Sequence, residues 1–185
     1  MEKLKEKYKK EVVPVMMKKF GYKSPMAVPS IKKVILNSSF GKEVVGKSAA
    51  EREKVQNIVM QDLSLIAGQK AKLIKAKKSI SGFKLRENMV IAAMVTLRRN
   101  RMWDFLERLI YLSLPRVRDF KGIDPKSIDK NGNLSIGFKE HISFPEIFAE
   151  KEKTIFGLEV TIVANAKSKE EGLELYKLLG FPIKS

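Results

Sequence analysis

Residues 40–48, FGKEVVGKS, contain the glycines, the lysine and the hydroxyl group that a phosphate-binding loop needs. Gly41 and Gly46 are separated by four residues, and Lys47 and Ser48 follow directly, which matches the pattern G-x-x-x-x-G-K-[ST]. In such a loop the backbone amides surround the phosphates, the lysine neutralises them and the hydroxyl binds Mg²⁺. The chemistry would be nucleotide binding and phosphoryl transfer.

The neighbouring residues favour a simpler interpretation of this stretch. Ser48 stands three residues before Glu51 at the start of a helical pattern, which is the spacing of a capping box. Residues 42–45 supply a carboxylate and two β-branched side chains, which suit poorly a tight loop wrapped around a phosphate. No later apolar strand ends in an Asp suited to hold the metal. We therefore predict a basic surface loop and a helix cap, with a P-loop phosphotransferase as the alternative.

Other catalytic groups are sparse. The chain has no Cys and a single His, His141, which excludes disulfides, thiolate metal sites and a His-rich metal centre. His141 has no nucleophile at a recognisable spacing, and we expect it on the surface or at a strand edge. The carboxylates of 140–152 lie in a stretch interrupted by proline and are interpreted as solvated charges: Glu140, Glu146, Glu150 and Glu152. The sequence predicts no catalytic residue, no cofactor and no metal site.

The charge of the chain is its strongest compositional signal. The formal net charge is +16, and it is concentrated in two segments. Residues 1–33 hold ten Lys against three Glu, and residues 70–101 hold ten basic residues against one acidic residue. Such concentration predicts a surface that binds a polyanion, and a nucleic-acid backbone fits because each basic contact releases counterions. A solvated charged face is the simpler alternative. A membrane surface is a weaker one, because the bases do not share one amphipathic helix.

The hydrophobic pattern predicts the elements that must carry these charges. We expect strands and helices mixed without a strict βαβ repeat, hence one α+β domain over 1–185 with a largely antiparallel sheet. Helices would pack on one face of that sheet, and a basic hairpin loop would project from it. The expected helices are 2–20, 49–67, 101–113 and 168–180, and the expected strands are 31–38, 70–76, 88–98, 134–138 and 157–166.

Local signals set several boundaries of these elements. Pro14 could kink the first helix, and Pro115 should end the third. Asn131 and Gly132 form a hairpin turn signal before the strand LSIGF. The last helix should begin at Ser168 with a capping box completed by Glu171.

Several blocks of the sequence are found together in one protein family. In order they are KKVILNSSFG, IAGQKAKLIKAKKSISGFKLRENM, VTLRRNRMWDFLERLIYLSLPRVRDFKGI, NGNLSIGFKEHISFPEI and GLEVTIVANAKSKEEGLELYKLLGFPIK. The most specific of them are RMWDFLERLI, PRVRDFKG and AKSKEEG. From residue 3 to residue 184 the chain resembles the bacterial large-subunit ribosomal protein family that binds 5S rRNA.

The resemblance implies a structural constituent of the large ribosomal subunit in the cytoplasm, not an enzyme and not a membrane protein. Such proteins bind 5S rRNA in the central protuberance, contact the P-site tRNA and form an intersubunit bridge with a small-subunit head protein. Further partners would be 23S rRNA and neighbouring large-subunit proteins. The chain departs from the family at Ala92, Ala93 and Met94, where Gly or a basic residue is common, and at Glu87-Asn88, which lacks a usual Gly. A general RNA chaperone or translation factor is a second alternative.

The alternation of side chains along two strands predicts the 5S rRNA surface. Residues assigned to the core are Val34, Leu36, Ile91, Val95 and Leu97. Positions on the other face hold basic groups for phosphates and neutral polar groups for sugars and bases, which suits irregular RNA. The residues predicted to bind 5S rRNA are Lys33, Asn37, Thr96 and Arg98. The alternative is that the N-terminal helix covers this face.

The loop KAKKSISGFK, residues 75–84, is predicted to meet a second polyanion, because a purely structural loop would not need so many like charges. The family resemblance supplies the P-site tRNA as that partner. The residues predicted to bind it are Lys75, Lys77, Lys78, Ser79, Ser81 and Lys84. We expect Phe83 to be anchored in the core, with stacking on RNA as the alternative.

Overall fold

The structure, a computed structural model, describes residues 3–147 and 155–184 and divides into two compact units. The first unit comprises residues 1–34, 97–136 and 161–185, and the second comprises 35–96 and 137–160. Each unit is made of several separate segments of chain, and the boundaries between the units fall inside strands. Glu150 and Glu152 lie outside the described residues.

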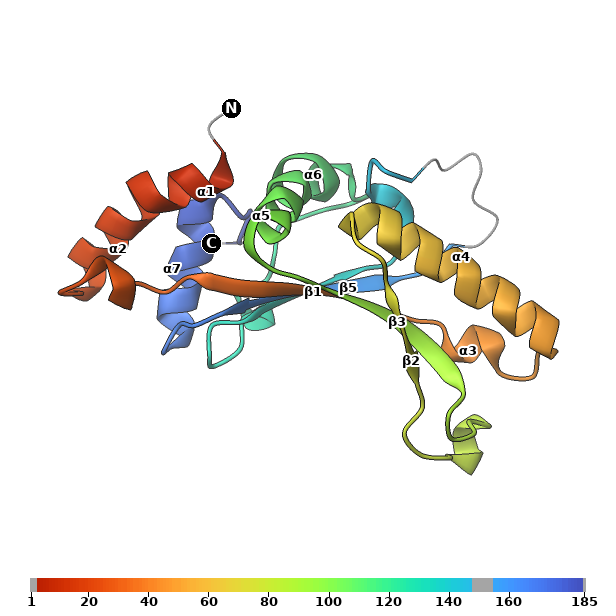
Figure 1. Ribbon diagram of the computed structural model, residues 1–185. Coiled ribbons are helices and arrows are strands. Elements are labelled where there is room, and N and C mark those ends of the chain that lie inside the picture. The colour runs from red at the N-terminus through yellow and green to blue at the C-terminus, as the bar shows by residue number, and fades with distance from the viewer. Residues whose placement is uncertain (1–2, 148–154, 185) are drawn as a thin grey trace. The chain divides into compact units, whose positions relative to one another are not determined.

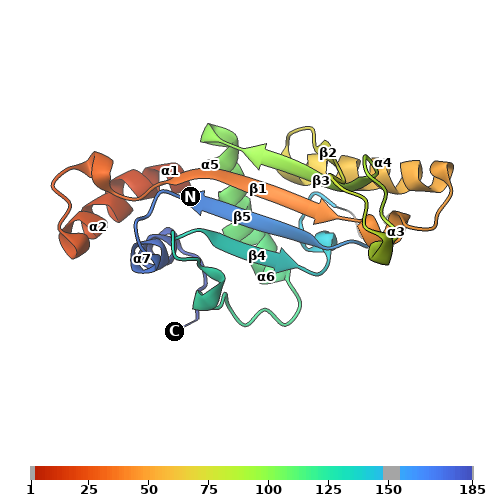
Figure 2. The same cartoon turned by 90° about the horizontal axis from the view of Figure 1, so that it is seen from below.

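The strands form a five-stranded sheet in the order β2-β3-β1-β5-β4 (Figure 2). β2 pairs antiparallel with β3, with Lys72 opposite Met94 and Leu73 opposite Ala93. The sheet is antiparallel and combines with helices, so the predicted α+β fold is confirmed. In chain order the strands are β1 Ile31–Ser39, β2 Lys72–Lys75, β3 Val90–Leu97, β4 Leu134–Phe138 and β5 Leu158–Ala164.

Within each unit one long helix lies on one side of the strands. In the second unit α4 (Ala49–Ala67) lies above β2 and β3 in Figure 1 and behind them in Figure 2. In the first unit α5 (Arg99–Arg108) likewise lies behind the strands of that unit in Figure 2. Along β5 every second residue is buried, from Leu158 to Ala164, as expected for a strand with one face against a core.

The N-terminal helix contains a wider turn just before its proline. It runs as α1 (Leu4–Lys7), a π-helical turn over Tyr8–Val12 and α2 (Val13–Phe20). Pro14 has no amide hydrogen and its ring would crowd the carbonyl four residues earlier in a regular α-helix. The π turn repositions that carbonyl, so the helix passes through Pro14 and ends at Gly21.

The same device extends α5 beyond its predicted end. A π-helical turn over Leu109–Ser113 follows α5, and α6 (Leu114–Arg116) contains Pro115. The prediction that Pro115 ends this helix was therefore wrong, because the π turn lets the helix continue past a proline as it does before Pro14.

The last helix, α7 (Lys169–Leu179), begins and ends as expected but is capped differently. The hydroxyl of Ser168 accepts from the amide of Glu171 at 3.3 Å. The carboxylate of Glu171 accepts from the amide of Lys167 at 2.8 Å, one residue before the predicted partner Ser168. Short helical turns complete the described chain: Pro25–Ala27, α3 Gly41–Val44, Ser81–Phe83, Pro125–Ser127 and His141–Ser143. No helix in the described part of the chain is both long and apolar enough to cross a membrane.

Candidate nucleic-acid interface

The stretch that resembles a P-loop is a helical turn followed by a capped helix. Residues 41–44 form α3, and Ser48 is the N-cap of α4. Glu51 accepts from the amide of Ser48 at 2.9 Å and from its hydroxyl at 2.7 Å. These hydrogen bonds, that of the hydroxyl first, lower the pKa of Glu51. An ionised carboxylate thus occupies the hydroxyl and amide that a phosphate or Mg²⁺ would need, which supports the helix-cap interpretation.

Side chains along β1 alternate between the core and the outer side of the strand. Val34 and Leu36 are fully buried, as predicted. Ser38 follows them on the inner side, where its hydroxyl donates to the carbonyl of Gly157 at 2.8 Å. Lys33 and Asn37 take the alternate positions and are half-buried. These two residues are therefore accessible from the side of β1 that faces away from the helices.

Along β3 the alternation is similar but incomplete. Val95 and Leu97 are buried as predicted, and Thr96 between them is half-buried. Ile91 is only half-buried, so its assignment to the core was wrong. It lies near the start of β3, where its carbonyl accepts from the amide of Phe40 at 2.9 Å and its neighbour is the short turn α3. β3 ends at Leu97, one residue before the predicted end of the strand, and Arg98, which follows it, is exposed.

The N-terminal helix contacts two other helices of the first unit. The ring of Tyr8 lies 5.6 Å from that of Trp103 on α5, and Lys19 forms an ion pair of 2.7 Å with Glu174 on α7. In both ribbon views α2 lies beyond the start of β1 (Figures 1 and 2). These contacts place the N-terminal helix against α5 and α7, while Ile31, on the same side of β1 as Lys33, is buried. The alternative that this helix covers the outer side of β1 therefore stays open.

The loop between β2 and β3 is a short hairpin with its own hydrogen bonds. Ile80 and Leu85 form a bridge with reciprocal amide-to-carbonyl distances of 3.1 Å. The hydroxyl of Ser79 accepts from the amide of Glu87 at 2.9 Å. Asn88 has a φ of 64°, a left-handed conformation that Asn tolerates better than most residues. This chain has Asn88 in a turn where relatives of the family commonly have Gly. Asn, after Gly, is among the residues that best tolerate the left-handed conformation.

The tip of this loop exposes both charge and apolar surface. Among the residues predicted to bind tRNA, all six are exposed: Lys75, Lys77, Lys78, Ser79, Ser81 and Lys84. Phe83 is 69% exposed and Ile80 is 45% exposed. The expectation that Phe83 is anchored in the core was wrong, because the Ser81–Phe83 turn leaves it exposed and away from the buried residues of β3. An exposed aromatic ring among lysines can stack on a base.

His141 is fully buried rather than at the surface, so that prediction was wrong. Its ring stacks on Phe156 at 3.9 Å with an interplanar angle of 8°, and its Nδ1 accepts from the amide of Phe156 at 3.4 Å. Its Nε2 lies 3.7 Å from a carboxylate oxygen of Asp62 on α4. The burial of Asp62 was predictable from its spacing, because it stands three residues after Val59 and seven after Val55, on the buried side of the helix.

Comparison with known proteins identifies the family. A family model described as ribosomal protein L5 matches residues 24–86, and a model described as the C-terminus of the same ribosomal family matches residues 90–183. The large ribosomal subunit protein uL5 of Desulforapulum autotrophicum is 51% identical over 185 residues, covering 100% of both chains. That of Dictyoglomus turgidum is 51% identical, and uL5c of Tetradesmus obliquus is 47% identical. Both alignments cover 100% of this chain and 99% of the relative.

The chain is thus a structural constituent of the large ribosomal subunit and not an enzyme. Ribosomal RNA binding follows from this class, as does a place in the ribosome, which in bacteria lies in the cytoplasm. The chain belongs to the ribosomal protein L5 family.

Proposed function

We propose that the chain binds 5S rRNA through the outer positions of β1 and β3 and helps to attach it in the central protuberance. The half-buried Asn37 and Thr96 offer neutral hydrogen-bonding groups, and Lys33 and Arg98 offer positive charge. Phosphate contacts hold an RNA in place, while groups such as Asn and Thr can distinguish 2′-hydroxyls and base edges. The single observation that carries this proposal is the alternation along β1 from Lys33 to Ser38, which buries Val34 and Leu36 and leaves Lys33 and Asn37 accessible.

We further propose that the loop between β2 and β3 contacts the P-site tRNA. Four exposed lysines can pair with phosphates, and the exposed Phe83 can stack on a base. Because Ser79 already accepts a hydrogen bond within the loop, its hydroxyl contributes mainly to the loop conformation. The tRNA contact is therefore assigned chiefly to Lys75, Lys77, Lys78 and Lys84, with Ser81 as a neutral contact.

The remaining partners in this proposal follow from the family resemblance. They are 23S rRNA, neighbouring large-subunit proteins and a small-subunit head protein that forms an intersubunit bridge. We also propose that residues 1–185 act as one RNA-binding domain, because the chain passes between the two units within β1, β3, β4 and β5.

Binding to isolated 5S rRNA tests the central proposal. We expect the purified chain to retain 5S rRNA in a gel-shift assay in the presence of excess tRNA, and Asn37→Ala to weaken that retention. Asn57→Ala, at an exposed position of α4, is the matched control because it removes the same amide from the opposite side of the second unit. Equal affinities for 5S rRNA and for unrelated structured RNA would contradict the proposal and favour a general RNA chaperone.

A further inference from the structure

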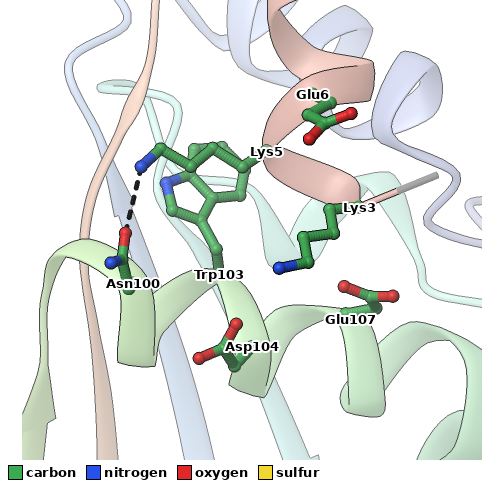
Figure 3. A pocket seen from close by; sticks show the side chains of 7 residues that line it. All are labelled: Lys3, Lys5, Glu6, Asn100, Trp103, Asp104 and Glu107. Carbon is green, nitrogen blue, oxygen red and sulfur yellow. Dashed lines mark hydrogen bonds between the residues drawn. The ribbon is translucent and has the colours of Figure 1, made fainter.

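A pocket of about 340 Å³ lies in the first unit between the N-terminal helix and α5 (Figure 3). We call it the α1–α5 pocket. Three carboxylates line it, from Glu6, Asp104 and Glu107, against two ammonium groups, from Lys3 and Lys5. The lining therefore carries a net negative charge on a chain whose formal net charge is +16. Phosphates are disfavoured beside such carboxylates, and cations are favoured.

An aromatic wall accompanies these carboxylates. Trp103 is half-buried, and its ring packs against that of Tyr8, with the ring centres 5.6 Å apart. Tyr8 is itself fixed, because its hydroxyl donates to the carbonyl of Pro29 at 3.0 Å. The indole thus packs against an anchored tyrosine and lies next to groups that accept hydrogen bonds. Tryptophan is the side chain that attracts cations most strongly over its face.

The chain's own lysines already enter this pocket. Figure 3 shows Lys3 extending toward α5 between Asp104 and Glu107. Lys5 passes across the indole in the same view, and its Nζ donates to Oδ1 of Asn100 at 3.0 Å. Both lysines are exposed, and exposed pairs of this kind are weakly held because water screens them. The pocket therefore accommodates cationic groups that a better-fitting cation could displace.

We propose that the α1–α5 pocket binds an arginine side chain from a basic segment of a neighbouring protein. A guanidinium is planar, so it can stack on the indole of Trp103 while its edge donates two hydrogen bonds to one carboxylate. Lysine offers a single charged point and matches this combination less well. The partner is thus a protein with an exposed arginine in an extended or mobile segment. An RNA segment would instead bring phosphates toward Asp104 and Glu107.

Fluorescence of Trp103 tests this proposal directly, because it is the only Trp in the chain. The probe is the peptide acetyl-Gly-Arg-Gly-Arg-Gly-amide, titrated into the full chain at low salt. We expect it to change the emission of Trp103 in a saturable way. The same peptide with citrulline, which is neutral and has the same shape, should bind at least about tenfold more weakly, and the lysine peptide should fall between them.

Variants then assign the signal to the pocket. Asp104→Asn combined with Glu107→Gln should weaken arginine-peptide binding by about tenfold or more, the loss of charge-assisted hydrogen bonds. Lys3→Gln should strengthen it by about two- to threefold, because a competing cation leaves. Glu53→Gln, at an exposed position of α4 in the second unit, removes one negative charge elsewhere and should change nothing. Thermal unfolding of each variant shows whether it is folded, and the arginine and citrulline peptides can be compared without any variant.

Two outcomes would overturn the proposal. The first is equal binding of the arginine and citrulline peptides, or no change in emission with either. The second is a saturable change in Trp103 emission with a short single-stranded RNA that Lys3→Gln or Lys5→Gln abolishes, which would make the pocket part of an RNA surface.

Discussion

Two regions of the second unit expose different kinds of groups for the proposed contacts with RNA. The outer positions of β1 and β3 hold Asn37 and Thr96 half-buried on a strand, where the backbone fixes their direction. The loop between β2 and β3 holds Lys77, Lys78 and Phe83 exposed on a short hairpin. Asn37 and Thr96 have little freedom and no charge, whereas the loop has charge and an exposed aromatic ring.

The contrast between strand and loop decides what each region can contribute to binding. A neutral group held on a strand loses little entropy when it binds and releases no counterion, so its contribution depends weakly on salt. An exposed lysine gains most of its binding free energy from counterion release and is strongly screened. The strand positions are therefore suited to specificity for one RNA, and the loop to a contact that can form and release. Four sets of substitutions test this contrast, in decreasing order of their expected effect.

Phe83→Ala should have the largest effect on the tRNA contact. Stacking of one base on an aromatic ring contributes about 1–3 kcal/mol, so P-site tRNA affinity should fall by roughly 5- to 150-fold with an unchanged salt dependence. The measurement is P-site tRNA binding to ribosomes that carry the variant. Phe83 is 69% exposed, so the free energy of unfolding of the isolated chain should change little. A large loss of stability with unchanged tRNA binding would show that the ring packs within the protein instead.

Replacing Lys77 and Lys78 together with Ala should weaken P-site tRNA binding in a salt-dependent way. If each lysine contacts one phosphate, the slope of log affinity against log salt should fall by about 1.4–1.8. Affinity for 5S rRNA should stay within about twofold, since distant sites act independently. The control replaces Lys42 and Lys47 with Ala, two lysines of the same unit that lie outside this loop. A large loss of 5S rRNA binding would assign the loop to the 5S rRNA surface.

Lys33→Ala and Arg98→Ala should each lower 5S rRNA affinity and reduce the salt slope by about 0.7–0.9, the contribution of one phosphate contact. Lys54→Ala, an exposed residue of α4, is the matched control for charge. Gel-shift titrations at several salt concentrations give the slope. A slope that falls as much in the control as in the variants would mean that charge acts at long range and that β1 and β3 carry no specific phosphate contact.

Asn37→Ala should have the smallest effect, with a distinctive signature. Loss of one neutral hydrogen bond costs about 0.5–1.5 kcal/mol, so 5S rRNA affinity should fall by roughly two- to thirteenfold. The salt slope should not change, because no counterion is involved. The same titrations measure both quantities. If Asn37→Ala and Lys33→Ala gave the same slope, the proposed division between neutral and charged contacts would be lost.

The strand and helix pattern was predictable because it depends on neighbours in the sequence. The helix 49–67, its capping box and the alternation of Val34 and Leu36 with Lys33 and Asn37 all follow from periods of 3.6 and 2 residues. The interpretation of residues 40–48 as a loop and helix cap followed from the same local rules, because the spacing of Ser48 and Glu51 is that of a capping box. The family resemblance rested on sequence blocks and needed no coordinates.

Helix ends beyond prolines were not predictable from those local rules. Pro115 normally marks the end of a helix, and only the π turn over Leu109–Ser113 shows that the helix passes it. Whether a wider turn forms depends on how well the flanking turns are packed. Leu109, Ile110 and Leu114 are buried, which offsets the poorer hydrogen-bond geometry of the π turn.

The environments of single side chains needed the tertiary structure. Composition and local sequence were enough to establish the class of fold, the two basic segments and the absence of cysteine chemistry, because these depend on residue types and local order. They did not show that His141 stacks on Phe156 beside Asp62, that Phe83 is exposed, or that Lys3 extends between Asp104 and Glu107. Each of these features joins or separates residues far apart in the chain, and burial is decided by such distant neighbours rather than by periodicity.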